Sequence, residues 1–213
     1  MPADVLARLK PTLSADERDR ASRFRFDPDR EAFIAVRGSL RLLLARYLGR
    51  SAAGIVFEYG PRGKPHCPNQ ADIAFNLSSS GGIALFAFAR GCEPGIDLER
   101  VRAIPELLDV AKRFFSPGEV AELAALPEDR RERVFFHCWT RQEARVKATG
   151  EGLATPEDGG CPWNLCNFDP AGGYAAALAY RGRRRRVVLS PFLAPARLLS
   201  DSGRKSLSFA PLN

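Results

Sequence analysis

The apolar positions of this chain follow two periodicities, which predict helices in some segments and strands in others. Apolar residues recur every three or four positions over 29–48, the spacing of one helix face, at Phe33, Val36, Leu40, Leu43, Leu44 and Tyr47. Asp27-Pro28 is a typical start for this helix, and Gly49 a typical end. A second long helix is predicted over 128–149, stopped by Gly150. Shorter helices are predicted after capping boxes at Ser14 and Ser116, and over 105–115.

Shorter apolar runs between these helices predict strands. They cover 55–59, 72–77, 83–89, 95–98, 164–168, 174–180 and 186–189. Residues 60–70 predict a loop rich in proline and glycine, and the small residues 78–82 predict a turn. Helix, strands, helices and strands in this order predict an α+β fold in which helices cover a few strands.

Length and composition narrow the class of protein. The 213 residues are 45% hydrophobic and 27% charged, which is typical of a globular chain. The longest apolar runs, 83–89 and 174–180, are far shorter than the roughly 20 residues of a membrane span. Because charged residues occur within the first ten positions, we do not expect a secretory segment there. Five cysteines without a CxxC pair are typical of free thiols, so we expect a cytoplasmic protein without a membrane partner.

Positive charge gathers at the carboxyl end of the chain. Residues 170–213 hold eight Arg or Lys and one acidic residue, and therefore carry the whole net charge of +7. The densest cluster is Arg181–Arg186. Such a cluster attracts nucleic acid, acidic membranes or acidic proteins, but it can equally be a solvated hairpin end. The last dozen residues, rich in Ser, Lys and Arg, are expected to be disordered.

The strongest chemical signal is Gly95-Ile96-Asp97-Leu98-Glu99. On a strand, Asp97 and Glu99 project to one side, while Ile96 and Leu98 project to the other, toward the core. Two adjacent carboxylates repel unless a cation lies between them, and oxygen ligands favour Mg²⁺. The alternative is a pair of solvated acids on an exposed strand.

A second signal lies on the helix predicted over 128–149. Glu143 and Lys147 are four residues apart and share a helix face. Together they could supply a metal ligand or base and a phosphate clamp. Alternatively they form a surface ion pair, which stabilises a helix by only ~0.2–0.5 kcal/mol.

Further candidates could hold phosphates. Ser78, Ser79 and Ser80 lie in a segment of small residues whose hydroxyl and amide groups could approach an anion, although such a segment can be a plain hairpin turn. Other cationic candidates are the rigid loop Arg62-Gly63-Lys64-Pro65 and the pair Arg37 and Arg41, one helical turn apart. The chain contains no Walker loop, Gly-x-Ser-x-Gly elbow or common zinc pattern.

Taken in order, five blocks resemble the 4′-phosphopantetheinyl transferase superfamily, in its surfactin-synthetase-activating branch. The blocks are Gly63-Lys64-Pro65, Phe75-Asn76-Leu77-Ser78-Ser79-Ser80, Gly95-Ile96-Asp97-Leu98-Glu99, Arg113-Phe114-Phe115-Ser116-Pro117-Gly118-Glu119, and the segment from Trp139 to Leu153. They cover residues 63–153. The arginine-bearing helix over 29–48 also resembles the family.

The resemblance implies an α+β fold of two similar, pseudo-symmetric halves with the active site between them. Residues 1–103 would carry the coenzyme A-binding loops and the first metal-ligand strand. Residues 104–213 would carry the catalytic helix and a basic C-terminal hairpin. The implied reaction moves the phosphopantetheine arm of coenzyme A to a serine of an acyl or peptidyl carrier protein and releases 3′,5′-ADP.

The resemblance also assigns residue roles. Asp97, Glu99 and Glu143 would hold Mg²⁺, with Mn²⁺ as a substitute. Glu143 would help deprotonate the serine, and Lys147 would neutralise the α-phosphate. The implied coenzyme A contacts are Arg37, Arg41, Arg62, Lys64, Pro65, Ser78, Ser79 and Ser80. The expected partner is an acidic apo-carrier protein, and we expect a monomer that does not bind nucleic acid.

Two positions depart from the family pattern. Ser79 stands where the family has a histidine, and Gln142 where it has a lysine. Both family residues contact coenzyme A phosphates, so two positive or donating groups are missing. This leaves open a second hypothesis, a protein that binds coenzyme A or a carrier domain with little turnover. A nucleic-acid-binding protein that uses Arg181–Arg186 is a third.

Overall fold

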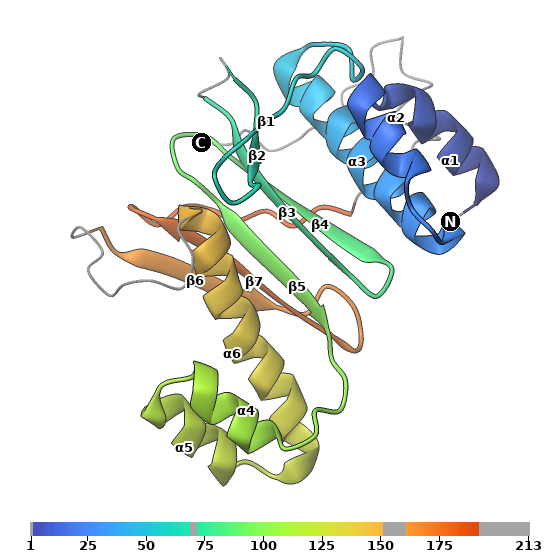
Figure 1. The fold of residues 1–213 in the computed structure, drawn as a ribbon. Helices are drawn as coiled ribbons and strands as arrows, with labels where there is room; N and C mark the ends of the chain where they lie inside the picture. Colours follow the sequence, from blue (N-terminus) through green and yellow to red (C-terminus); the bar gives the residue numbers. More distant parts are fainter. Residues whose placement is uncertain (1, 69–71, 151–160, 192–213) are drawn as a thin grey trace. The chain divides into compact units, whose positions relative to one another are not determined.

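The computed structural model describes residues 2–68, 72–150 and 161–191, and groups the chain into two compact units (Figure 1). The first unit comprises Met1–Glu58, Cys67–Gln70 and Arg185–Asn213, and the second Tyr59–His66 and Ala71–Arg184. The expected disorder of the last dozen residues lies outside the described residues. The proposed division into related halves at residue 103 stays a prediction. None of the described helices is both long and apolar enough to cross a membrane.

The first unit is a small helical assembly of α1 (Ala3–Leu9), a 3₁₀ turn (Lys10–Thr12), α2 (Ala15–Ser22) and α3 (Asp27–Leu48). As predicted, Ser14 and Glu17 form a capping box on α2, and Gly49 ends α3 in the left-handed conformation. Leucine, isoleucine and alanine side chains pack between these helices, namely Leu9, Leu13, Ala21, Ile34, Ala35 and Leu42. The predicted amphipathic helix is therefore the scaffold of this unit.

The second unit contains β3 (Ala74–Ser80), β4 (Ile83–Ala89), β5 (Gly95–Arg100), α4 (Leu107–Phe114), α5 (Pro117–Ala125), α6 (Glu128–Thr149), β6 (Trp163–Phe168) and β7 (Tyr174–Arg181). Strands β3 and β4 form an antiparallel hairpin, and β5, β7 and β6 form a three-stranded antiparallel sheet in that order. Figure 1 shows α6 running along this sheet, with α4 and α5 beside its first half. The mixture of helix and sheet confirms the α+β class.

Small residues on the central strand allow α6 to lie close to the sheet. Alternate residues of β7 project toward α6, because side chains alternate between the two faces of a strand. Ala177 and Ala179 pack against Ala144 of α6, whereas Ala175 joins a larger cluster around Phe135 and Phe136. A row of alanines at this interface thus determines the depth at which α6 lies.

Three predicted segments differ from the structure. Over 55–59, only β1 (Glu58–Tyr59) is a strand, and it pairs with the two-residue β2 (Pro65–His66) inside the predicted loop. The predicted turn over 78–82 is wrong for its first three residues, which belong to β3. Only Gly81 and Gly82 form the turn, with φ of 55° and 89°. These positive angles favour glycine.

The predicted strand over 186–189 is also wrong, because these residues have no strand conformation and Val187, Val188 and Leu189 are exposed. Strand β7 ends at Arg181, the first residue of the arginine cluster, so the rest of the cluster follows the last described strand and is not a turn between two described strands. An apolar run forms a strand only when a neighbouring strand satisfies its backbone groups.

Candidate active site

Strand β5 carries a buried carboxylate into the contact between the sheet and α6. Ile96 and Leu98 are core residues, as predicted, but Asp97 is also buried, with only 3% of its surface exposed. The strand begins at Gly95, where an added Cβ would lie 1.9 Å from the Ala144 carbonyl oxygen and 2.4 Å from the Ala148 amide nitrogen. Backbone of β5 and backbone of α6 are therefore in direct contact beside Asp97. This burial excludes a pair of freely solvated acids.

The Asp97 carboxylate links β5 to α6 and β3. Lys147 Nζ donates to Asp97 Oδ1 at 2.6 Å, and Ser78 Oγ donates to the same oxygen at 3.1 Å. Lys147 also donates to Ser78 Oγ at 3.0 Å, which closes a triangle of three polar groups. Asp97 Oδ2 is buried and has no hydrogen-bond partner. Leaving a buried charged oxygen unpaired is costly, so this atom is suited to a ligand.

Two further carboxylates lie near enough to Asp97 to influence one another. Burial raises the pKa of the Glu143 carboxyl above its ordinary value, and the charges of Asp97 and Glu99 raise it further, while Lys147 acts in the opposite direction. Glu99 is 28% exposed by its side chain, accepts a hydrogen bond from Ser80 Oγ at 3.4 Å and lies 3.6 Å from Arg102. The three groups together form a concentration of negative charge.

The donor set of these carboxylates fits a hard divalent cation. All three groups offer oxygen, which Mg²⁺ prefers, and one buried oxygen of Asp97 has no partner. Among the residues that the structure describes, no three acidic, histidine or cysteine side chains already converge at metal-binding distances. Lys147 already occupies one oxygen of Asp97, so a cation shared by the three carboxylates would require these side chains to rearrange.

Strand β3 presents its serines in two directions. Ser78 and Ser80 face β5, where they bond to Asp97 and Glu99, whereas Ser79 is exposed. The predicted turn over 78–82 would have placed all three serines together. The strand alternation separates them, so they cannot share one ligand in the same way.

The cationic candidates differ in how much of their charge is already engaged. Arg62 is exposed, whereas Lys64 Nζ donates to Glu93 Oε2 at 2.9 Å and to the Ala148 carbonyl at 3.1 Å. Lys64 therefore also bonds to one carbonyl in the last turn of α6, a favourable place for a cation. Pro65 follows it at the start of β2.

Arg37 and Arg41 both face Glu17 within the first unit. Arg41 is 1% exposed, and its Nε donates to Glu17 Oε2 at 2.5 Å while its Nη1 donates to the carbonyls of Ala52 and Ile55. Arg37 Nε lies 3.4 Å from Glu17 Oε1, yet its buried Nη1 has no partner. Arg41 thus holds the segment after α3 in place, and Arg37 retains donor capacity.

The residues around the two departures have internal roles. Gln142 Nε2 donates to the Phe114 carbonyl at the end of α4 at 2.9 Å. Arg141 contacts Glu119, the motif glutamate that also caps α5 through Ser116, and Arg145 lies over the ring of Trp163. Both arginines are thus engaged in contacts within the protein. The contact between Glu119 and Arg141 leaves no signal in the sequence, because two motifs 22 residues apart meet only in the fold.

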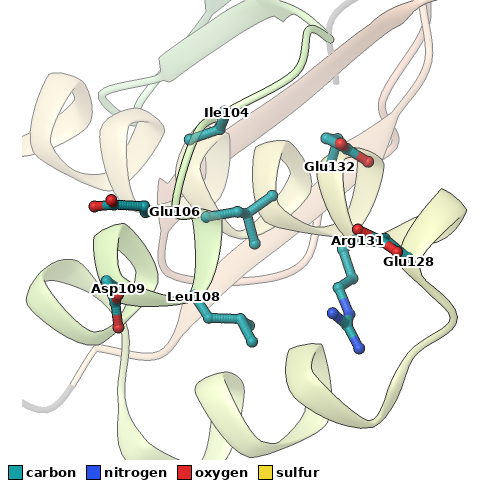
Figure 2. A pocket seen from close by; sticks show the side chains of 8 residues that line it. Ile104, Glu106, Leu108, Asp109, Glu128, Arg131 and Glu132 are labelled. Carbon is teal, nitrogen blue, oxygen red and sulfur yellow. The ribbon is translucent and has the colours of Figure 1, made fainter.

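A separate cavity lies between α4 and the start of α6 (Figure 2). Figure 2 shows Glu106 and Asp109 on one side and Glu128 and Glu132 on the other, with Ile104 and Leu108 between them. Arg131, which also lines the cavity, donates to the carbonyls of Leu126 and Ala124. None of Asp97, Glu99 and Glu143 lines this cavity, so it is distinct from the Asp97 cluster.

Comparison with known proteins identifies a family and several relatives. The family model of the 4′-phosphopantetheinyl transferase superfamily matches residues 93–188. The 4′-phosphopantetheinyl transferase HetI of Nostoc sp. is 42% identical over 160 residues, 74% of this chain and 68% of the relative. Sfp of Bacillus subtilis strain 168 is 32% identical over 152 residues, 71% of this chain and 66% of the relative.

A further relative matches a shorter part of the chain. The 4′-phosphopantetheinyl transferase AcpT of Escherichia coli K12 is 37% identical over 112 residues, 52% of each protein. The matched region therefore spans between about half and two thirds of the length of these relatives. With 42% identity over more than two thirds of the Nostoc relative, the chain belongs to the 4′-phosphopantetheinyl transferase superfamily, the family that its ordered motifs predicted.

Proposed function

We propose that this protein transfers the 4′-phosphopantetheine arm of coenzyme A to a serine hydroxyl of an acyl or peptidyl carrier protein and releases 3′,5′-ADP. The observation that carries the proposal is the buried, unpartnered oxygen of Asp97 beside Lys147 and the Glu143 carboxylate. Family membership supplies the transferase class. Transfer of a phosphoryl-type group is catalysed mainly by positioning the reactants and neutralising charge. This cluster of charged side chains can provide both.

Asp97, Glu99 and Glu143 are the proposed magnesium ligands. When bound there, Mg²⁺ would neutralise charge on the pyrophosphate of coenzyme A. Glu143 would in addition accept the proton of the attacking serine, directly or through a water. Burial is the main cause of its raised pKa, and the charges of Asp97 and Glu99 add to it, a repulsion that a cation would relieve.

Coenzyme A contacts are proposed for residues with donor capacity to spare. These are Arg37, Arg62, Lys64 and the exposed Ser79, with Pro65 keeping the 62–65 loop rigid. Arg41 is left out of the proposed coenzyme A contacts, because its guanidinium is buried against Glu17 and two carbonyls. Ser78 and Ser80 are likewise bonded to β5.

The direct test incubates the full chain with coenzyme A, Mg²⁺ and a panel of apo-carrier proteins. We expect a carrier species heavier by one phosphopantetheine group in intact-mass spectra. EDTA should stop its formation, and added Mg²⁺ or Mn²⁺ should restore it. Carrier domains with an acidic helix near the serine should react best, since the chain carries +7. Size-exclusion chromatography of the same sample tests the predicted monomer.

A second function, binding without turnover, is favoured by one contact. Gln142 stands where the family has lysine; its amide is uncharged, and one of its N–H groups already donates to the Phe114 carbonyl, so it does not replace the missing charge. If this function holds, calorimetry shows coenzyme A binding while no carrier in the panel gains mass. Product formation at a rate comparable with Sfp measured in parallel excludes it.

Lys147→Ala is expected to lower kcat far more than it alters the KM for coenzyme A. The ammonium group lies in the carboxylate cluster and would meet charge developing on the α-phosphate, an interaction made mainly in the transition state. We expect a loss of about 100-fold in kcat at saturating coenzyme A. Lys112→Ala, which removes an exposed lysine paired with Asp109, is the matched control and should retain full activity. A normal kcat in Lys147→Ala removes this residue from the mechanism.

Ser79→His is expected to tighten coenzyme A binding. The exposed position faces away from Asp97 and restores the family histidine. A charge-assisted hydrogen bond to phosphate contributes about 1.5–3 kcal/mol, or roughly tenfold or more in affinity. Titration calorimetry with coenzyme A measures the change, and Ser22→His on the exposed end of α2 controls for added imidazole. Unchanged or weaker binding would show that Ser79 does not lie at the phosphate.

A further inference from the structure

Strands β3 and β5 lie side by side although they belong to different sheets in the described part of the chain. Side chains of β3 take the place of a backbone ladder. Asn76 Oδ1 accepts from the Ile96 amide at 2.9 Å, Ser78 Oγ from the Leu98 amide at 3.2 Å, and Ser80 Oγ from the Arg100 amide at 3.1 Å. Each pair is 20 residues apart, so the two strands run in the same direction in one register.

The same serines also hold the carboxylates of β5. Ser78 Oγ donates to Asp97 Oδ1 at 3.1 Å, and Ser80 Oγ lies 3.4 Å from Glu99 Oε2. Each hydroxyl thus accepts from one backbone amide of β5 and donates to the carboxylate of the residue before it. A shift of β3 by one residue would replace both serines with side chains of the opposite face, because strand side chains alternate. The register of β3 therefore determines where Asp97 and Glu99 are held.

Ser78 has no hydrogen-bonding capacity left for a phosphate. A hydroxyl offers one donor and two acceptor positions. In Ser78 the donor serves Asp97, and the acceptors serve the Leu98 amide and Lys147 Nζ. The side chain is also buried. A coenzyme A phosphate could bond to it only after one of these contacts breaks.

We infer that Ser78 is a positioning residue, which orients Asp97 and Lys147 toward the reacting phosphates, and that Asn76 and Ser80 keep it in register. This inference rests on the proposed function for the identity of the reaction. It replaces the expected coenzyme A contact of Ser78 by a role inside the protein. The turn after β3 supports the arrangement, because Tyr174 of β7 donates its hydroxyl hydrogen bond to the Gly81 carbonyl and so holds the hairpin end against the second sheet.

The hydrogen-bond network is tested first, without any reaction. Amide hydrogen exchange, followed by NMR on the full chain, is compared between the wild type and Ser78→Ala. The Leu98 amide is expected to exchange at least about tenfold faster in the variant, because it loses its acceptor, while the Ile96 and Arg100 amides change by less than about twofold. Unchanged protection of Leu98 overturns the inference.

The positioning role is tested by separating rate from binding. In Ser78→Ala, kcat is expected to fall by about 10–100-fold, the usual effect of removing a partner that orients a site residue. The dissociation constant for coenzyme A, from calorimetry, should stay within about twofold, since no contact to the cofactor is removed. A large loss of coenzyme A affinity with a normal kcat would overturn the inference and restore Ser78 as a direct contact.

Two further variants keep the test decisive. Ser80→Ala alters a partly exposed position, so it remains foldable if Ser78→Ala does not, and it should accelerate exchange at Arg100. Ala84→Gly weakens the β3–β4 hairpin without touching the network and should leave kcat per folded molecule unchanged. If kcat falls as far in Ala84→Gly as in Ser78→Ala, general loosening explains the effect and the inference fails. A wild-type chain inactive on every carrier refutes the proposed function, while the exchange result still decides the network.

Discussion

Asp97→Ala is expected to reduce phosphopantetheine transfer by at least about 1000-fold, equivalent to ~4 kcal/mol of transition-state stabilisation. The substitution removes the most buried carboxylate of the cluster and the partner of Lys147. A cation held by the two remaining carboxylates would bind more weakly and could not be placed against the pyrophosphate. Glu143→Ala should have a comparable effect, because it removes a proposed ligand and the proposed base together. Transfer rates come from intact-mass spectra of the carrier.

Asp97→Asn serves as the variant that keeps the shape of the side chain. It removes the charge but leaves an oxygen for Lys147 and Ser78, so a loss of activity cannot be assigned to a cavity. Calorimetry should show that Asp97→Asn no longer binds Mn²⁺. This measurement does not depend on turnover. Asp109→Ala, which removes an exposed carboxylate on α4, is the control and should behave as wild type. Full activity in Asp97→Ala would refute the metal assignment.

Gly95→Ala is expected to be the most destabilising single methyl addition in the second unit. The new Cβ would lie 1.9 Å from one backbone atom of α6 and 2.4 Å from another, and backbone cannot rotate away as a side chain can. Overpacking of this kind costs about 3 kcal/mol or more, which corresponds to a fall of roughly 6–12 °C in Tm for a chain of this size. Because α6 carries Glu143 and Lys147, the transfer rate should also fall, in proportion to the loss of folded protein.

Gly118→Ala supplies the matched control for this substitution. Gly118 lies in the first turn of α5 and has open space around its Cβ position. Replacing it should leave Tm unchanged or raise it slightly, since alanine favours a helix by about 1 kcal/mol over glycine. Thermal unfolding followed by circular dichroism compares the two variants. A Tm of Gly95→Ala within about 2 °C of wild type would contradict the close packing of β5 on α6.

The local signals of the sequence predicted those features that depend on neighbouring residues in the chain. The helix over 128–149 has the predicted bounds, and the capping boxes at Ser14 and Ser116 form as expected. Helix periodicity and caps involve contacts within about four residues, so they can be recognised without the fold. The alternation that places Ile96 and Leu98 in the core is equally local. The ordered motifs also identified the family.

Contacts between distant segments were decided only by the tertiary structure. The sequence alone treated Ser78, Ser79 and Ser80 as one turn, but pairing with β4 makes them strand residues, with Ser78 on Asp97 and Ser79 exposed. Residues 186–189 have strand composition and yet form no strand, because no strand of the described structure pairs with them.

The partners of charged and polar side chains show the same division. The spacing of Glu143 and Lys147 predicted residues on one helix face, but only the fold brings Lys147 to Asp97, 50 residues earlier in the chain. The sequence suggested Arg41 as a phosphate contact, whereas in the structure Arg41 is a buried hydrogen-bond partner of Glu17. The sequence by itself determined which chemical groups this protein carries and on which local elements they lie. The tertiary structure decided which of them meet, because buried polar groups must find partners across distant segments when water is excluded.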